Sequence, residues 1–344
     1  MKKRLLITAL LWVALILVSA CVGRYPLSLE DIFLIITGKH ESATAVSLFL
    51  EIRLPRVLLV AYGGGALAVS GAVFQTLFSN PLVSPDVLGV TSGCSVGAVF
   101  AMLFLPSAMW AVQGSAFVFG LLVVAFALFL SSFVKSNRIL GMVLAGIIVS
   151  SAASAVLMIF KMVADPLNQL PAIEYWLMGG FQNSTNSKLI LVVSITIIPL
   201  ILMYLLRYRL KVLSLGDEQA QSLGISPLKT RIFFIVLATL PVSAVVSVAG
   251  VVSWIGLIAP HIVRLCISRD ISKNMGAVFF TGGVLLMAAD LFARNISGLE
   301  LPISIFTSLF GSVFLTFLLI RRFLIKKEET DCENSSKRPY SRVS

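Results

Sequence analysis

Four charged side chains in this sequence have types and spacings that could do chemistry in an apolar environment. Asp290 stands well inside an uncharged stretch, and Arg294 follows it at the i, i+4 spacing that brings two side chains together on a helix. An acid at such a depth is typical of ion-coupled secondary transporters, whereas an arginine one turn away favours a structural ion pair near a helix end. Arg53 and Arg56 lie three residues apart, and a planar guanidinium can hold a carboxylate through two parallel hydrogen bonds.

The sequence lacks the motifs on which many hydrolytic enzymes depend. It contains no Gly-x-x-x-x-Gly-Lys-Ser/Thr phosphate loop, no His-Glu-x-x-His and no Gly-x-Ser-x-Gly. Its four Cys and two His include no Cys-x-x-Cys and no paired His, so no pattern indicates a zinc site or a disulfide framework. We therefore expect no catalytic residue, no metal site and no cofactor in this chain.

The composition is that of a membrane protein. Hydrophobic residues make up 58% of the 344 residues and charged residues 12%, whereas soluble globular chains carry roughly 25% charged residues. The mean hydropathy is +0.98, and so apolar a chain requires lipid as its solvent. The elements that position the charged residues must therefore be helices that cross a bilayer, each about 20 residues long.

Uncharged stretches predict about ten transmembrane helices and an all-α polytopic fold. Six stretches of single-span length are 5–23, 57–79, 139–160, 189–206, 275–293 and 301–320. The stretch 87–134 is too long for one helix and has a turn signal at Pro106, so it predicts two crossings. The stretch 232–263 fits either one steep helix or two short helices broken near Gly250 and Pro260.

The basic tails decide between nine and ten crossings. Lys and Arg fill positions 2–4, before the first stretch, and recur from 321 to 327, after the last one. Because short flanking segments rich in Lys and Arg stay in the cytoplasm, both termini are expected inside and the number of crossings is even. We predict a transmembrane domain over 1–326 and a polar, disordered cytoplasmic tail over 327–344. The net charge of +11 then reflects topology, and no nucleic-acid partner is expected.

The N-terminus allows two interpretations. The basic start, the apolar run and Val-Ser-Ala-Cys at 18–21 are typical of a lipoprotein signal peptide. A retained first helix is the alternative, and we expect retention because nine further crossings make a cleavable export signal unnecessary. The rest of the predicted topology is the same in both cases.

The longest cytoplasmic loop between predicted spans contains a short polar helix, 216–224, flanked by two glycines. Its residues of interest are Gly216, Asp217, Glu218, Ala220, Leu223 and Gly224. The two acids stand at the helix start, where the positive end of the helix dipole favours them. The loop alone fits a docking element and a solvated connector equally well.

Small residues at helical spacing predict close helix contacts. Gly64, Ala68 and Ala72 form one ridge, and Gly146, Ser150 and Ser154 form another. Ridges of this kind favour helix packing over the lining of a pathway. The equal separations of Gly71 from Pro81 and of Gly250 from Pro260 agree with an inverted repeat of spans 2–5 and 7–10, and His261 is expected to have a structural role.

Several short motifs, taken in order, resemble the FecCD-type permease family of ABC importers for vitamin B12, iron-siderophores, haem and related chelates. The motifs are Arg53–Arg56, Gly71–Gln75, Asn80–Pro85 with Leu88–Gly89, Trp176–Gly180, Gly216–Asp217 with Ala220 and Leu223–Gly224, Gly256–His261 with Arg264, Ala289–Asp290 with Ala293–Arg294, and Glu300–Pro302. Each motif is short, and their order and spacing from 53 to 302 carry the resemblance. Ten spans are also what this family has.

The resemblance implies the partners and the location of the protein. It implies a cell-membrane permease paired with a second copy or a paralogue, two cytoplasmic ATPase subunits and an extracytoplasmic binding protein. The helix from Gly216 to Gly224 would dock the ATPase, which would hydrolyse ATP on a separate chain. Arg53, Arg56 and Arg294 would meet at the outer surface and hold acids of the binding protein, with anchoring to lipid head groups as the alternative. The ridge from Gly146 to Ser154 would border the pathway.

Overall fold

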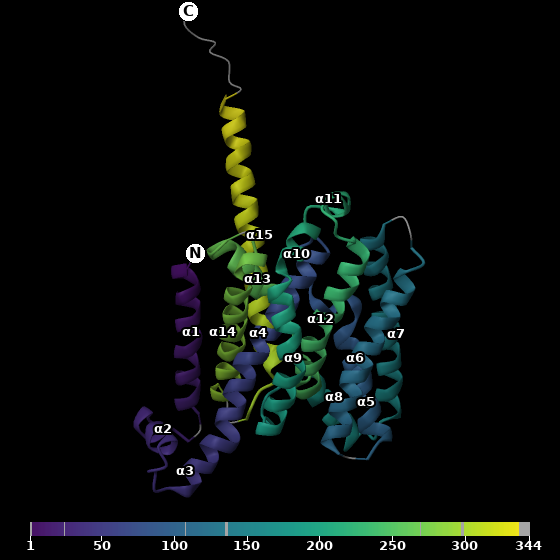
Figure 1. Ribbon diagram of the computed structural model, residues 1–344. Helices are drawn as coiled ribbons and strands as arrows, with labels where there is room; N and C mark the ends of the chain where they lie inside the picture. The colour runs from purple at the N-terminus through teal and green to yellow at the C-terminus, as the bar shows by residue number, and fades with distance from the viewer. Residues whose placement is uncertain are drawn as a thin grey trace, which may run out of the picture.

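The computed structural model describes residues 2–23, 25–106, 108–134, 137–268, 270–296 and 299–336, and every regular element within these ranges is a helix. Ten of these helices correspond to the ten predicted crossings (Figure 1). They are α1 (Lys2–Cys21), α4 (Leu54–Leu77), α5 (Val90–Phe104), α6 (Met109–Ser131), α7 (Arg138–Val163), α9 (Asn186–Leu205), α12 (Pro227–Ala249), α13 (Ile255–Cys266), α14 (Met275–Asn295) and α15 (Ile303–Ser336). The predicted all-α membrane fold is confirmed.

The two long uncharged stretches each divide into two helices. Residues 87–134 form α5 and α6 on either side of the turn at Pro106, and residues 232–263 form α12 and α13 with a break over 250–254. The two-helix alternative for the second stretch is therefore confirmed, although Pro260 lies inside α13 rather than at its end. With 12 residues, α13 is about 18 Å long, which is shorter than the thickness of a bilayer core.

Eight shorter helices complete the described structure. They are α2 (Leu29–Ile36), α3 (Ala43–Ser47), the π-helix η1 (Leu48–Arg53), the 3-10 helix η2 (Pro85–Leu88), α8 (Gln169–Leu177), α10 (Arg207–Leu213), α11 (Asp217–Ser222) and the 3-10 helix η3 (Ser272–Asn274). Figure 1 shows α11 at the end where α1 begins and toward which α15 extends, and α2, α3 and α8 at the opposite end. These ends are called the α11 end and the α8 end below.

Helix α15 continues to Ser336, so the predicted tail, 327–344, begins inside this helix. Residues 337–344 lie outside the described residues, and the disorder of the tail stays a prediction. The inverted repeat of spans 2–5 and 7–10 also stays a prediction.

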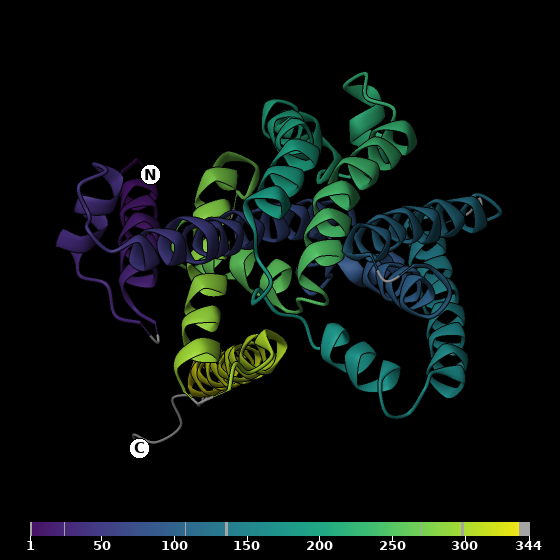
Figure 2. The ribbon, with the colours of Figure 1, turned by 90° about the horizontal axis from the view of Figure 1, so that it is seen from below.

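Helix α4 is the centre of the molecule and is buried on nearly all sides. Seen from the α8 end, it runs across the middle, with α1 and α14 on one side and α5, α6 and α7 on the other (Figure 2). Its small-residue ridge permits this position, because Gly64 lies against Gly282 of α14 so closely that an added Cβ would stand 2.5 Å from the Gly282 carbonyl oxygen. Ala68 and Ala72 on the same ridge are fully buried. This ridge therefore packs helix against helix.

The second ridge, on α7, is divided between a contact and an open face. Gly146 lies directly against the Val87 carbonyl of η2, and Ser150 lies beside Gly89. Ser154 is exposed. One end of this ridge therefore packs against η2 within the subunit, and the other end is free of such contacts.

We predict that Gly64→Ala lowers the free energy of unfolding by about 1 to 3 kcal/mol, because the added methyl group must push α4 away from α14. Gly114→Ala on α6 is the matched control, since nothing lies within 4 Å of the added methyl group there, and it should be neutral or stabilising. Equilibrium unfolding of the purified protein in detergent measures both changes. Equal stability of the two variants would contradict the packing role of the Gly64–Gly282 contact.

Candidate functional site

Helix α11 forms a protrusion at its end of the bundle (Figure 1). Gly216, with φ +112°, and Gly224, with φ +76°, turn the chain before and after it, and these are conformations that residues with a side chain rarely adopt. Leu215 and Leu223 are each 56% exposed and flank the short helix, and Glu218 is exposed between them. The tip thus exposes apolar and acidic side chains on the surface at this end of the bundle.

The base of the protrusion is fixed by an ion pair to α12. The two carboxylate oxygens of Asp217 lie 2.9 and 2.7 Å from the guanidinium nitrogens of Arg231, which is itself buried. The Nε of Arg231 also donates to the carbonyl oxygen of Leu77 at 3.3 Å. Since Leu77 is the last residue of α4, the contacts of Arg231 connect α11 to the central helix.

The residues predicted to dock the ATPase are thus not all on the surface. Glu218, Leu223 and Gly224 are exposed, and Gly216 is partly exposed. Ala220 is fully buried inside the loop, and Asp217 is bound to Arg231. A larger side chain at Ala220 would therefore disturb the packing of the loop itself, and it would affect a partner only indirectly.

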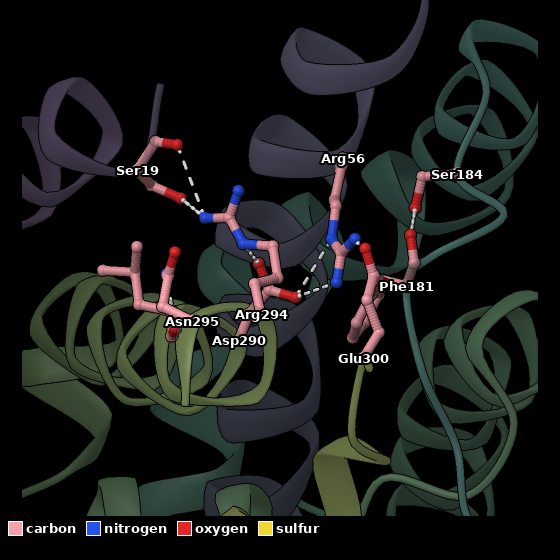
Figure 3. A network of polar contacts seen from close by, with 9 residues as sticks. Ser19, Arg56, Phe181, Ser184, Asp290, Arg294, Asn295 and Glu300 are labelled. Atoms are coloured by element: carbon pink, nitrogen blue, oxygen red, sulfur yellow. Dashed lines mark hydrogen bonds and ion pairs between the residues drawn. The ribbon is translucent and has the colours of Figure 1, made fainter. Parts of the chain in front are cut away.

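A network of buried charges lies at the α8 end, where α4 meets α14. The Arg56 guanidinium donates to Asp290 at 2.9 and 3.1 Å and to Glu300 at 2.9 Å. Arg294 reaches the other oxygen of Asp290 at 3.0 Å, which confirms the predicted i, i+4 ion pair. Figure 3 shows Arg56 and Arg294 on two sides of Asp290. Asp290 is 1% exposed, so two arginines compensate one buried carboxylate.

Arginines also hold the end of α1. Arg294 donates to the Ser19 hydroxyl at 2.6 Å. Arg53 donates to the carbonyl oxygens of Ala20, Cys21 and Tyr25 at 3.0, 3.2 and 2.6 Å. These acceptors include carbonyls that the end of a helix leaves without partners. Removal of residues 1–20 would break several of these bonds.

The three arginines predicted to hold a binding protein therefore lie in one region but are buried. Arg53 and Arg56 are 7% exposed and Arg294 is 8% exposed. Their hydrogen bonds go to groups of the same chain, and among the network's acids Glu300 is the partly exposed one, at 31% of its side chain. A role of these arginines in docking stays a prediction.

Sequence reasoning missed two long-range contacts that these sites depend on. Arg56 and Asp290 are 234 residues apart, and Arg231 and Leu77 are 154 residues apart. No spacing rule connects residues at such distances. The available signal was an acid and several arginines in spans that otherwise carry no charge, since charges in a membrane are paired.

His261 lies on α13. Its ring packs edge-on against Phe314, with the ring centroids 5.8 Å apart. This contact agrees with the structural role expected for it.

Comparisons with known proteins identify relatives along nearly the whole chain. The model of the FecCD transport family matches residues 10–321. The chain is 35% identical over 286 residues to a probable iron chelatin transport system permease protein of Helicobacter pylori, covering 82% of this chain and 85% of the relative. It is 34% identical over 320 residues to the hemin transport system permease protein HmuU of Yersinia pestis, covering 91% and 94%. A solved structure described as a metal-chelate type ABC transporter in an inward-facing conformation superposes with a TM-score of 0.85 at 32% identity, covering 93% of this chain and 100% of that one.

We predict that Asp290→Asn lowers the free energy of unfolding by about 3 to 5 kcal/mol, because it leaves the charge of Arg56 without its buried partner. Glu300→Gln is the control in the same network, and its effect should stay below about 1 kcal/mol since that side chain is partly exposed. Unfolding in detergent measures both. A smaller loss for Asp290→Asn than for Glu300→Gln would show that the buried pair does not stabilise the α4–α14 contact.

Proposed function

The chain belongs to the FecCD transport family, and from this membership we propose that it is the membrane-spanning permease subunit of an ABC importer for a metal chelate. The match over residues 10–321 is the observation that carries the proposal. An iron-siderophore, haem or cobalamin is the proposed class of cargo. The chain itself performs no hydrolysis, and ATP is hydrolysed on partner subunits.

We place the α11 end in the cytoplasm and the α8 end outside the cell membrane. The basic residues near both termini support this orientation, and the first residues of α1 lie at the α11 end (Figure 1). Two ATPase subunits would then meet α11, one on each of two permease copies, and a binding protein would deliver the chelate at the α8 end. The second permease copy is identical to this chain or a paralogue of it.

The geometry explains how α11 could transmit a movement of the ATPase. Leu215, Glu218 and Leu223 provide an exposed tip for the partner. The ion pair between Asp217 and Arg231 fixes the base of α11 to α12. A push on the tip would therefore reach α12, and through the Leu77 carbonyl also α4, instead of being absorbed by a flexible loop.

At the outer end the network of arginines supports docking of an acidic partner. Arg53, Arg56 and Arg294 carry three positive charges, while Asp290 and Glu300 carry two negative ones. The network therefore keeps one positive charge, which would attract an acidic side chain of the binding protein. We propose that the arginines act in docking through this excess charge, with Glu300 at the exposed rim.

Ion-coupled secondary transport is the alternative mechanism, and the surroundings of Asp290 weigh against it. Coupling requires a carboxylate that can bind and release a cation inside the membrane. Asp290 is held between Arg56 and Arg294, with ion-pair distances of 2.9 and 3.0 Å. Each oxygen of Asp290 therefore already faces a fixed arginine, which disfavours the binding and release of a travelling cation.

Reconstitution tests the proposal directly. We expect proteoliposomes that contain the permease, its ATPase and its binding protein to import an iron-55 chelate only with ATP. Uptake should persist after ionophores collapse the proton and sodium gradients. Uptake without the ATPase, driven by an imposed gradient, would instead establish secondary transport.

We predict that Leu223→Asp weakens association with the ATPase at least about ten-fold, because a charge replaces an apolar side chain at the tip. Leu167→Asp is the control: Leu167 is 85% exposed and precedes α8 at the other end. Co-purification and ATP-dependent uptake measure the effect, and gel filtration verifies that both variants are assembled. Normal association of Leu223→Asp would exclude α11 as the docking element.

A further inference from the structure

A cavity of about 490 Å³ opens at the α8 end, between α5, α6, α8, α9 and α12. Met102, Val112 and Trp176 contribute apolar wall, and the amides of Gln113 and Gln182 also line it. It is separate from the network of Arg56 and Asp290, none of whose residues line it. The cavity therefore combines an apolar wall with a few groups that can form hydrogen bonds, as ligand sites do.

Lys188 is the one charged side chain among the described residues that line this cavity. It lies near the start of α9 and is only 7% exposed. Its Nζ donates one hydrogen bond, to the Asn183 carbonyl oxygen at 2.7 Å. An ammonium group has three N–H donors, and within the described part of the chain no carboxylate stands within 4.0 Å of it.

The other strongly buried cations of the described residues are better compensated. Arg56, Arg231 and Arg294 each have a carboxylate within 3.0 Å. Arg53 has no carboxylate but donates to three carbonyl oxygens. Lys188 has one carbonyl and an adjoining cavity, so its charge is the least compensated of the five.

The start of α9 adds to the positive potential. Thr185 caps this 20-residue helix, and its hydroxyl accepts a hydrogen bond from the backbone N–H of Lys188. The first turn of a helix carries a partial positive charge, which favours an anion nearby. The ammonium and the helix dipole therefore act in the same direction beside the cavity.

We infer that this cavity binds the anionic oxygen group of a ligand, and that Lys188 Nζ is the group that receives it. The apolar wall around Trp176 would hold the apolar part of any ligand that has one. Such a ligand has two possible sources. The first is an anionic metal chelate delivered at the outer face, and this source rests on the proposed function. An anionic lipid of the outer leaflet has the same chemistry and is the second source.

Equilibrium dialysis of the full-length protein in phosphatidylcholine nanodiscs tests the site without ATP or partner subunits. The probes are ferric citrate, which is anionic, and ferrioxamine B, a cationic iron chelate, both labelled with iron-55. We expect Lys188→Gln to weaken the binding of ferric citrate about ten-fold or more and to leave the binding of ferrioxamine B unchanged. The Lys188→Arg variant keeps the charge, and its affinity for ferric citrate should stay within about three-fold of that of the parent protein.

Two further variants separate binding from folding. Lys161→Gln is the matched control, because Lys161 already has a carboxylate partner, Glu174, at 2.9 Å, and it should not alter ferric citrate binding. Ala172→Phe fills the cavity from α8 without removing a charge, and it should abolish binding while thermal unfolding stays unchanged. If the parent protein, Lys188→Gln and Ala172→Phe all bind ferric citrate with equal affinity, the inferred site is wrong. This conclusion holds even if ATP-dependent uptake is normal.

A second arm distinguishes the two sources. Native mass spectrometry of protein from nanodiscs that contain phosphatidylglycerol detects retained anionic lipid. If Lys188→Gln no longer retains phosphatidylglycerol and this lipid displaces ferric citrate from the parent protein, the site binds the lipid. This result would support the anion site. Binding of ferric citrate that phosphatidylglycerol does not displace would assign it to the chelate. Absence of both Lys188-dependent signals would overturn the inference.

Discussion

The ion pair between Arg56 and Asp290 fixes the arrangement on which the rest of the molecule depends. Both groups are buried in a membrane-spanning bundle, where an unpaired charge is costly. Eight residues along each helix, Gly64 meets Gly282, about 12 Å from the ion pair. Because α4 and α14 run in opposite directions, the two contacts define one antiparallel register. The ion pair tolerates no slip of one helix along the other, and the glycines bring the helix backbones into direct contact.

Helix α4 also connects the two ends of the molecule. Its 24 residues span about 36 Å, from the network around Arg56 to the carbonyl of Leu77. At that carbonyl, Arg231 joins it to α11 through Asp217. A single rigid helix therefore contacts both the proposed entry side and the proposed coupling side. Such a helix can convert a displacement at one end into a tilt at the other.

The sequence was sufficient for features that local rules encode. Uncharged stretches of about 20 residues predicted six of the ten helices, and a turn signal at Pro106 together with the basic tails predicted the other four. The i, i+4 spacing predicted the pair of Asp290 with Arg294. It was not sufficient for contacts between distant segments, such as Arg56 with Asp290, because no periodicity relates them. The inward position of Ala220 and the burial of Lys188 were missed for a related reason. Which face of a helix is covered depends on its neighbours, and neither the six residues of α11 nor the largely apolar sequence of α9 reveals them.

The bonds that hold the end of α1 have a consequence for how the chain is assembled. Ser19 accepts from Arg294, and the two residues are 275 positions apart. At a synthesis rate of roughly 5 to 20 residues per second, the ribosome completes Arg294 on the order of tens of seconds after Ser19. During that interval the Ser19 hydroxyl lacks this partner, whereas the carbonyls of Ala20 and Cys21 can already accept from Arg53, which follows them by 33 and 32 positions. The contact of α1 with α14 therefore forms late in biogenesis, and a stalled or truncated chain would expose this face of α1 to membrane quality control.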